Sequence, residues 1–270
     1  MKVSIVTISY NQSAFLEKTI KSVLSQDYNY TEYILVDAGS TDRSREIINK
    51  YRNLISKVIL EPDEGPADGL NKGFRFANGN IYGFLNSDDI LFPGVITKVV
   101  KFFKTNPNID VVSGDAIMID ENDAKIRKLH SDHFSLIRYA YGANFLAQQS
   151  TFFRSSVFKK VGGFNIQNNC SWDGELFVDI ALTGGRFAVV KEIWSGFRAH
   201  PRSISCSGKL DQEFDKYMVR IFRKIMKREQ QPIDHMIGYC FRVIKHLLNL
   251  RGLVNRLLFQ LAIISNRAKY

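Results

Sequence analysis

The chain has 270 residues, 45% hydrophobic and 24% charged, which are the proportions of an ordinary globular protein with a sizeable core. Its three cysteines, Cys170, Cys206 and Cys240, lie far apart without CxxC spacing, so neither a disulfide framework nor a zinc site is expected. The net charge of +10 is uneven: residues 209–270 hold 13 Lys/Arg and 5 Asp/Glu (+8), and residues 1–208 hold the other 24 and 22 (+2).

Strands and helices alternate over the first ~105 residues. Apolar, β-branched runs predict strands over residues 2–8, 33–37 and 58–60, and a central strand that starts at residue 81 and ends in Asp88 and Asp89. Apolar residues at helical spacing predict a helix after each strand, with Ser13 and then Thr41 or Asp42 as candidate N-caps. This order predicts a parallel sheet with helices on both faces.

Acidic residues follow three of these strands. Asp37, Asp63 and the pair Asp88 and Asp89 each stand directly after a strand, so we expect them at one edge of the sheet. Neighbouring carboxylates repel each other unless a cation neutralises them, and Mg²⁺ or Mn²⁺ is often shared between a carboxylate and a substrate's phosphates. The alternative for Asp88 and Asp89 is a polar turn after a strand.

The rest of the chain carries further strands and helices. We expect strands over residues 110–120, 125–130, 151–153 and 187–190, a short helix that ends at Gly162 and Gly163, and a helix over 172–182. There is no GxGxxG after the first strand and no GxxxxGK[ST], which removes the main support for a dinucleotide or P-loop protein. A bound diphosphate would therefore depend on a metal ion at the acidic edge.

Four segments together resemble the ordered motifs of family 2 glycosyltransferases: residues 4–11 (SIVTISYN), 35–42 (LVDAGSTD), 68–73 (DGLNKG) and 86–89 (NSDD). The resemblance covers roughly residues 1–205. It implies the GT-A fold, a Rossmann-like, mixed and mainly parallel α/β sheet flanked by helices. The domain would occupy residues 1–208, with a basic helical extension over 209–270.

The resemblance also implies roles on the donor side. Tyr10 and Asp37 match positions that hold the base of a nucleoside-diphosphate sugar, Asp88 matches a contact to the ribose and diphosphate, and Asp89 matches the principal ligand of a divalent metal (Mn²⁺ or Mg²⁺). Three residues match a segment that borders the donor: Asp68, Asn71 and Lys72. Many relatives have Arg directly before this Asn, whereas this chain has Leu70.

The second half of the chain resembles the acceptor side of the family. Asp173 aligns with the catalytic base, although Trp172 replaces the usual Glu before it, and Glu175 is the second candidate. The alternative for Asp173 is a carboxylate that stabilises a helix N-terminus. His200, beside Arg198 and Arg202, lies in a segment that closes over the donor in some relatives and is a further candidate metal ligand.

These roles predict a metal-dependent, inverting glycosyltransferase. Asp173 would remove a proton from an acceptor hydroxyl, and the metal would stabilise the departing diphosphate. The acceptor would be a saccharide or a lipid-linked molecule in the synthesis of a cell-surface polysaccharide or glycolipid.

The basic extension allows several interpretations. Residues 209–229, 234–250 and 253–267 predict amphipathic helices that could lie on the inner face of an anionic membrane, in a cytoplasmic enzyme. The alternatives are that they pack on the catalytic domain or pair with a second copy in a homo-oligomer.

A nucleic-acid-binding protein is a rival interpretation of the positive charge, but it leaves the acidic edge unexplained, so no nucleic acid is expected as a partner. A nucleotidyltransferase or a non-catalytic binder of nucleotide sugars is a further rival.

Overall fold

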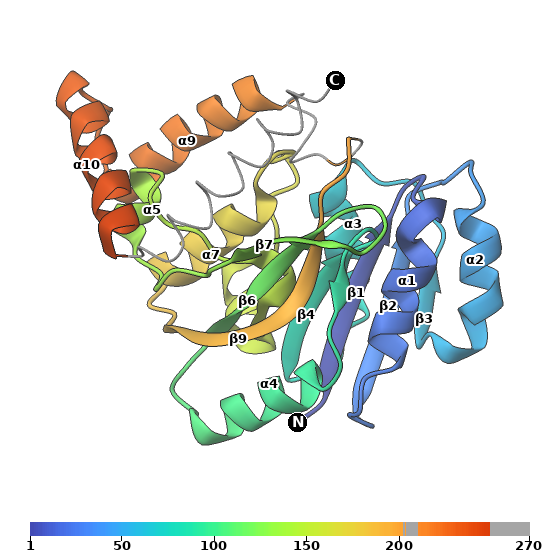
Figure 1. Cartoon of the computed structure of the whole chain (residues 1–270). Helices are drawn as coiled ribbons and strands as arrows, with labels where there is room; N and C mark the ends of the chain where they lie inside the picture. Colours follow the sequence, from blue (N-terminus) through green and yellow to red (C-terminus); the bar gives the residue numbers. More distant parts are fainter. Residues whose placement is uncertain (202, 204–209, 249–270) are drawn as a thin grey trace.

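One mixed β-sheet runs through the molecule, with helices on both of its faces (Figure 1). The computed structural model describes residues 1–201, 203 and 210–248. Its strands are β1 (Val3–Ser9), β2 (Thr31–Asp37), β3 (Lys57–Ile59), β4 (Ile81–Asn86), β5 (Ile90–Leu91), β6 (Val111–Ile119), β7 (Lys125–Leu129), β8 (Thr151–Arg154) and β9 (Phe187–Arg198). In this part of the chain the order is β3-β2-β1-β4-β8-β6-β9-β5, with β7 paired to β6.

The first half of the sheet is parallel, as the alternation of strands and helices predicts. β1 pairs in parallel with β2 and with β4, and β2 pairs in parallel with β3. The second half is mixed, because β8 runs antiparallel to both β4 and β6 while β9 runs parallel to β6. The predicted mixed, mainly parallel α/β architecture is therefore confirmed.

The helices form two layers around this sheet. Apolar side chains of the first, second and fourth helices pack on one face, and those of the third, sixth and seventh pack on the other. The bounds are α1 (Ser13–Leu24), α2 (Ser44–Tyr51), α3 (Pro66–Arg75), α4 (Val95–Thr105), α5 (Leu136–Ala140), α6 (Ser155–Val161), α7 (Trp172–Leu182), α9 (Asp211–Met226) and α10 (Pro232–Leu248).

The start of α1 differs from the predicted cap. Ser13 is the first helical residue and the cap position belongs to Gln12, which makes no side-chain capping bond. The Asp42 carboxylate instead accepts the backbone N–H of Ser13 (2.9 Å) and of Ser44 (2.9 Å), so one side chain serves the first turns of both α1 and α2. Burial opposes ionisation here, but hydrogen bonds from Ser44 and Ser13 lower the pKa of Asp42 to about 2.

The C-terminal helices pack on the domain. α9 buries Tyr217, Ile221 and Phe222 against α5, α7 and α10, and Figure 1 shows α9 and α10 (orange to red) beside α5 and α7, on the side of the sheet away from α2. Basic residues of α9 and α10 pair with acidic residues of the domain, as in Arg220–Glu175 (2.6 Å) and Lys245–Asp132 (2.6 Å). Part of the excess positive charge of the extension is therefore neutralised inside the fold.

Some elements differ from the sequence-based prediction. β9 continues to Arg198, eight residues beyond the predicted end, because it pairs with both β6 and β5. The short elements β5 and α5 carry too few residues to show a period. The predicted third helix of the extension, over 253–267, lies outside the described residues. No helix in the described part of the chain combines the length and the apolar run that a membrane crossing needs.

Candidate functional site

The acidic residues gather at one edge of the parallel strands. Ser9 of β1 is in register with Asp37 of β2, and Ile8 is in register with Asn86, so the three strands end at the same level. Asp63 follows β3 and is half-buried. Burial raises the pKa of Asp63, the Gly65 N–H and the charge of Lys72 oppose this rise, and the negative charges of Asp68 and Asp37 add to it. The predicted acidic edge therefore exists.

Asp37 is buried and organises the loop that follows β2. Its carboxylate accepts the backbone N–H groups of Gly39 (3.3 Å) and Ser40 (3.0 Å) and the Ser40 hydroxyl (2.5 Å). Arg45 of α2 reaches the same carboxylate at 3.1 Å. Tyr10 stands at the end of β1 with 60% of its surface exposed. An open aromatic ring beside a rigid loop provides a flat surface on which a base could stack.

The end of β4 meets the end of β9. The Asp88 carboxylate lies 3.0 Å from Nε2 of the buried His200, and Asp89 accepts the backbone N–H of Arg198 at 2.9 Å through Oδ1. The Asp89 side chain is 1% exposed, and its Oδ2 has no hydrogen-bond partner. Nδ1 of His200 is likewise buried without a partner. Burial is the main cause that raises the pKa of Asp89, and repulsion from Asp88 adds to it. The hydrogen bond and the charge of Arg198 oppose this rise only in part.

These donor atoms fit a divalent cation that is shared with a ligand. A buried carboxylate oxygen without a partner, next to a second carboxylate, attracts a hard metal ion. Among residues 1–201, 203 and 210–248, however, no three His, Cys, Asp or Glu side chains are arranged to hold a metal by themselves. Asp88, Asp89 and His200 therefore do not make a complete protein-built site, and other ligands would come from the substrate's phosphates or water.

Arg198, which stands beside the candidate metal ligand His200 in the sequence, is buried and contacts the protein's own backbone and side chains instead of facing a site for an anion. Its guanidinium is 0% exposed, lies 4.9 Å from the Phe15 ring centre and donates to the backbone oxygens of Asp88 (2.8 Å) and Asp120 (2.8 Å). It also pairs with Asp123 at 2.6 Å. Arg198 thus fixes the loop that carries Asp88 and Asp89. Arg202 lies outside the described residues.

The three predicted residues of α3 mainly hold the local structure together. Asn71 exchanges two hydrogen bonds with the backbone of Phe164 (2.8 and 2.9 Å), and Lys72 pairs with Asp68 at 2.8 Å while donating to the Pro62 carbonyl at 2.6 Å. A donor role for Asp68, Asn71 and Lys72 stays a prediction. Their contacts do fix the segment between β3 and α3, which borders the acidic edge.

Asp173 lies in the first turn of α7, on the wall of a cavity of about 800 Å³. Burial raises the pKa of Asp173, although backbone N–H groups at the helix start lower it in part. Asn169, four residues earlier, lies against the start of α3, because a Cβ on Gly65 would be 3.0 Å from Asn169 Oδ1. The start of α7 therefore adjoins the side of the sheet where the acidic edge lies.

Two tyrosine hydroxyls support the start of α7. Tyr139 of α5 and Tyr217 of α9 lie with their oxygens 2.9 Å apart. The Tyr139 hydroxyl occupies the space where a Cβ on Gly174 would be, directly after Asp173. Sequence reasoning did not find this pair, because its members are 78 positions apart and each tyrosine alone is an ordinary amphipathic residue.

Gly174→Ala tests this packing. The new methyl group would overlap the Tyr139 hydroxyl, so we expect unfolding free energy to fall by about 1–3 kcal/mol. Chemical denaturation measures the change. Gly238→Ala in α10 is the matched control: its Cβ would meet no atom closer than 3.4 Å, and helix propensity predicts a gain of up to ~1 kcal/mol. Equal effects of the two changes would contradict the proposed close contact.

Glu175, the second candidate base, is committed to ion pairs. It is 3% exposed and accepts hydrogen bonds from Arg220 (2.6 Å), Asn168 (2.7 Å) and Asn165 (3.2 Å). Lys224 of α9 approaches it at 3.5 Å. These contacts leave Glu175 as an attachment point for α9, and they favour Asp173 as the base.

Glu175→Gln tests whether Glu175 attaches α9 to the domain or acts as the catalytic base. The amide keeps the shape but loses the charge that Arg220 and Lys224 face, so we expect unfolding free energy to fall by about 1–3 kcal/mol, less at high salt. Transfer by the folded protein should remain within a few-fold of the unchanged chain. A loss of turnover of 100-fold or more, with α9 still packed, would instead make Glu175 the base.

Comparisons with known proteins identify the family of the chain. The model of the family described as "Glycosyl transferase family 2" matches residues 4–162. Uncharacterized glycosyltransferases are 27% identical over 210 residues in Nostoc sp. and 30% identical over 182 residues in Mycobacterium tuberculosis. The first alignment covers 74% of this chain and 65% of the relative, and the second covers 67% and 69%. A PGL/p-HBAD biosynthesis glycosyltransferase of M. tuberculosis is 29% identical over 221 residues, with 79% and 82% covered.

Solved structures show the same fold. TarS of S. aureus in complex with UDP-GlcNAc aligns with a TM-score of 0.70 and 18% identity, covering 91% of this chain and 72% of TarS. The mannosyltransferase PcManGT from Pyrobaculum calidifontis, in complex with GDP-Man and Mn²⁺, aligns with a TM-score of 0.64 and 18% identity, covering 98% and 75%. With the GT-A fold of these structures and a family match over more than half of its length, the chain belongs to glycosyl transferase family 2, and the predicted enzyme class, a glycosyltransferase, is confirmed.

Proposed function

We propose that this protein transfers a sugar from a nucleoside-diphosphate sugar to an acceptor hydroxyl with inversion at the anomeric carbon, and that the reaction depends on a divalent metal. The observation that carries the proposal is the acidic edge with its unpartnered buried Asp89 oxygen, together with the half-buried Asp173 carboxylate in the first turn of α7. Structures of TarS with UDP-GlcNAc and of PcManGT with GDP-Man and Mn²⁺ support a donor and a metal of this kind.

The donor would lie along the carboxyl ends of β1, β2 and β4. Tyr10 offers its ring to the base, and the rigid loop held by Asp37 shapes the pocket around the nucleoside. Asp89 and Asp88 would hold Mn²⁺ or Mg²⁺, which, when bound, supplies positive charge that stabilises the leaving diphosphate. His200 positions Asp88 through its 3.0 Å contact.

Asp173 would act on the acceptor. Its carboxylate accepts the proton of the acceptor hydroxyl while that oxygen forms a bond to the anomeric carbon and the bond to the diphosphate oxygen breaks. The proton ends on Asp173 and the electron pair on the nucleoside diphosphate. Because attack and departure occur on opposite faces of the sugar in one displacement, the configuration inverts.

Donor hydrolysis tests the proposal without a known acceptor. A panel of UDP-, GDP- and TDP-sugars is incubated with the protein and Mn²⁺, and released nucleoside diphosphate is measured. We expect slow hydrolysis of one donor or a few related ones, and we expect EDTA to stop it. If no nucleoside diphosphate binds in calorimetry and no donor is hydrolysed, the proposed activity is wrong.

The acceptor class that we propose is a cell-surface glycan or glycolipid, in line with the mycobacterial relative, which is a PGL/p-HBAD biosynthesis glycosyltransferase. We place the enzyme at the inner face of a membrane, with α10 as the contacting helix. α10 exposes five large apolar side chains at helical spacing: Ile233, Met236, Tyr239, Val243 and Ile244. Such a stripe is typical of a helix that lies on a lipid surface.

Vesicle sedimentation tests the contact. We expect the protein to sediment with vesicles that contain anionic lipid, and we expect Met236→Glu combined with Val243→Glu to reduce the bound fraction at least about tenfold, because two charges would enter the apolar layer. Equal binding by both proteins would place the membrane contact elsewhere.

A further inference from the structure

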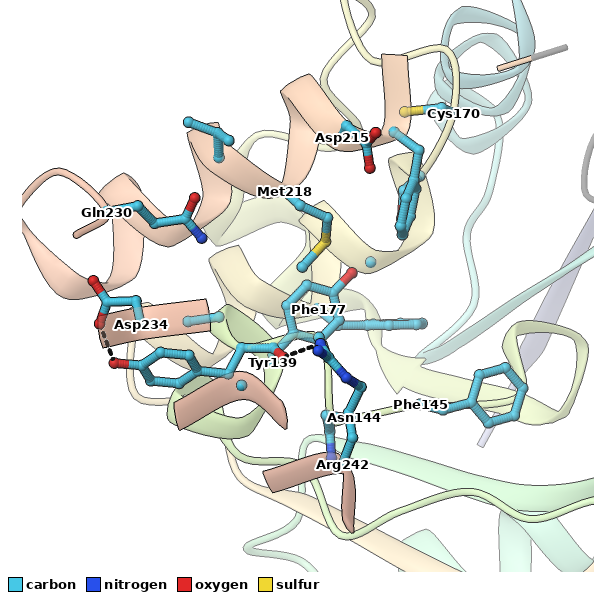
Figure 2. A pocket seen from close by; sticks show the side chains of 18 of the residues that line it. Tyr139, Asn144, Phe145, Cys170, Phe177, Asp215, Met218, Gln230, Asp234 and Arg242 are labelled. Carbon is cyan, nitrogen blue, oxygen red and sulfur yellow. Dashed lines mark hydrogen bonds between the residues drawn. The ribbon is translucent and has the colours of Figure 1, made fainter. Parts of the chain in front are cut away.

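The cavity beside Asp173 lies between the C-terminal helices and the segments around α5 and the start of α7. Its walls come from α5 and the segment after it, the start of α7, α9 and α10 (Figure 2). The family model ends at residue 162, so most of these walls lie beyond the shared core. The volume of about 800 Å³ is in the range of sites for ligands of small-molecule size.

Three large apolar side chains in the walls of the cavity are partly exposed. Phe145, Phe214 and Val219 are 39%, 45% and 38% exposed, and all three line this cavity. Figure 2 shows Tyr139, Phe177 and Met218 close together, with Phe145 to one side. Large apolar side chains that stay exposed in a concave site indicate a ligand with an apolar part.

Polar groups stand at defined places in the same walls. Asp173 supplies a carboxylate, and the polar side chains of Asn144, Gln230 and Arg242 line the same cavity (Figure 2). The cavity therefore suits a molecule that has hydroxyl groups as well as an apolar part.

The cavity is distinct from the donor edge. Tyr10, Asp37, Asp88 and Asp89 are not among its lining residues, whereas Asp173 is. Asp173 also lies in the first turn of α7, and the loop before this helix lies against the start of α3 at Gly65. A donor at the sheet edge and a molecule in the cavity would thus approach Asp173 from different sides.

We propose that this cavity binds the apolar aglycone of the acceptor, an alkyl or aryl group attached to the sugar or hydroxyl that Asp173 activates. The inference rests on the proposed function, because it takes Asp173 as the base. It assigns selection of the acceptor to this cavity, to which α5, α7, α9 and α10 all contribute. A purely saccharide acceptor is the competing outcome.

Calorimetry with n-octyl β-D-glucoside below its micellar concentration, and with methyl β-D-glucoside, tests the proposal on the full chain. We expect the octyl compound to bind at least tenfold more tightly than the methyl compound. Val219→Trp should weaken octyl binding at least tenfold by filling the cavity, whereas Lys216→Trp, on an exposed part of α9 that does not line the cavity, should not. Phe214→Ser, at a half-exposed ring, should weaken it without adding bulk.

Two results would overturn the proposal. Equal affinity for the methyl and octyl compounds would remove the apolar class of acceptor, and undiminished octyl binding in both cavity variants would place the binding site elsewhere, for example on the exposed stripe of α10. Binding of nucleoside diphosphate with Mn²⁺ is measured on the same samples. It should be unchanged in all variants, and its absence from the unchanged chain would count against the proposed function instead.

Discussion

Asp173→Asn should lower the rate of sugar transfer about 100- to 10,000-fold, the usual contribution of a general base, while affinity for the donor stays within a few-fold. The amide keeps the shape of the side chain at the start of α7 but cannot accept the acceptor's proton. Transfer to a competent acceptor measures the first effect, and calorimetry with nucleoside diphosphate and Mn²⁺ measures the second. Full turnover by the variant would assign the base to another residue.

The pH profile of the unchanged enzyme gives a second readout. The base works only when ionised, so kcat/KM should rise with pH through the pKa of Asp173. Because burial raises that pKa, the acidic limb should lie at higher pH than the ~3.9 of an exposed aspartate would give. In the Asp173→Asn variant, the kcat/KM of the residual activity should no longer rise with pH over this range.

Stability should change in the opposite direction to activity. A carboxyl group with a raised pKa in the folded protein binds its proton more tightly there than in the unfolded chain. Its contribution to stability is therefore largest at low pH and falls as pH rises through the two pKa values. At neutral pH the Asp173→Asn variant, which has an uncharged side chain at this position, should be at least as stable as the wild-type protein. This result would also exclude misfolding as the cause of the lost transfer.

Asp89→Asn should abolish the metal dependence of donor binding. In the presence of Mn²⁺, its affinity for nucleoside diphosphate should be at least about 100-fold weaker than that of the wild-type protein. Even residues that only orient a metal ligand change metal affinity or activity by about 10- to 100-fold, and Asp89 is proposed as the ligand itself. The amide can still accept the Arg198 N–H that Asp89 Oδ1 now accepts at 2.9 Å, so the loop should keep its shape. Titrations with and without Mn²⁺ measure the change.

Asp27→Asn is a suitable control for that experiment, because Asp27 pairs with the Thr97 hydroxyl (2.8 Å) on an exposed part of the surface. It should bind donor and metal like the unchanged chain. If Asp89→Asn retains metal-dependent binding, the proposed ligand is wrong, and Asp88, with its contact to His200, becomes the residue to change next.

Much of the fold could be predicted because its signals are local. Each of the first strands is a short apolar run followed by a polar turn, and parallel pairing brings their carboxyl ends to one edge. Asp37, Asp63, Asp88 and Asp89 were therefore placed correctly at that edge. The length of β9 could not be predicted, because residues 191–198 are extended through pairing with β5 and β6 and not through a pattern of their own.

The site was less accessible to sequence reasoning than the fold. The His200–Asp88 contact joins residues 112 positions apart, and the two bonds between Asn71 and Phe164 join residues 93 positions apart. A sequence shows which side chains could form such bonds but not which partner each one finds. The cavity is harder still, because it is a space between four segments, and its apolar walls resemble ordinary core residues in the sequence.

The ion pairs between Glu175 and the two cations of α9 have a consequence for how such an enzyme can diversify. They join α7, whose first turn carries Asp173, to α9, and both helices lie after residue 162, where the match to the family model ends. If the proposed acceptor cavity is correct, replacing α9 and α10 with the corresponding helices of a relative, together with a matching partner for Glu175, should change the acceptor and leave the choice of nucleotide unchanged.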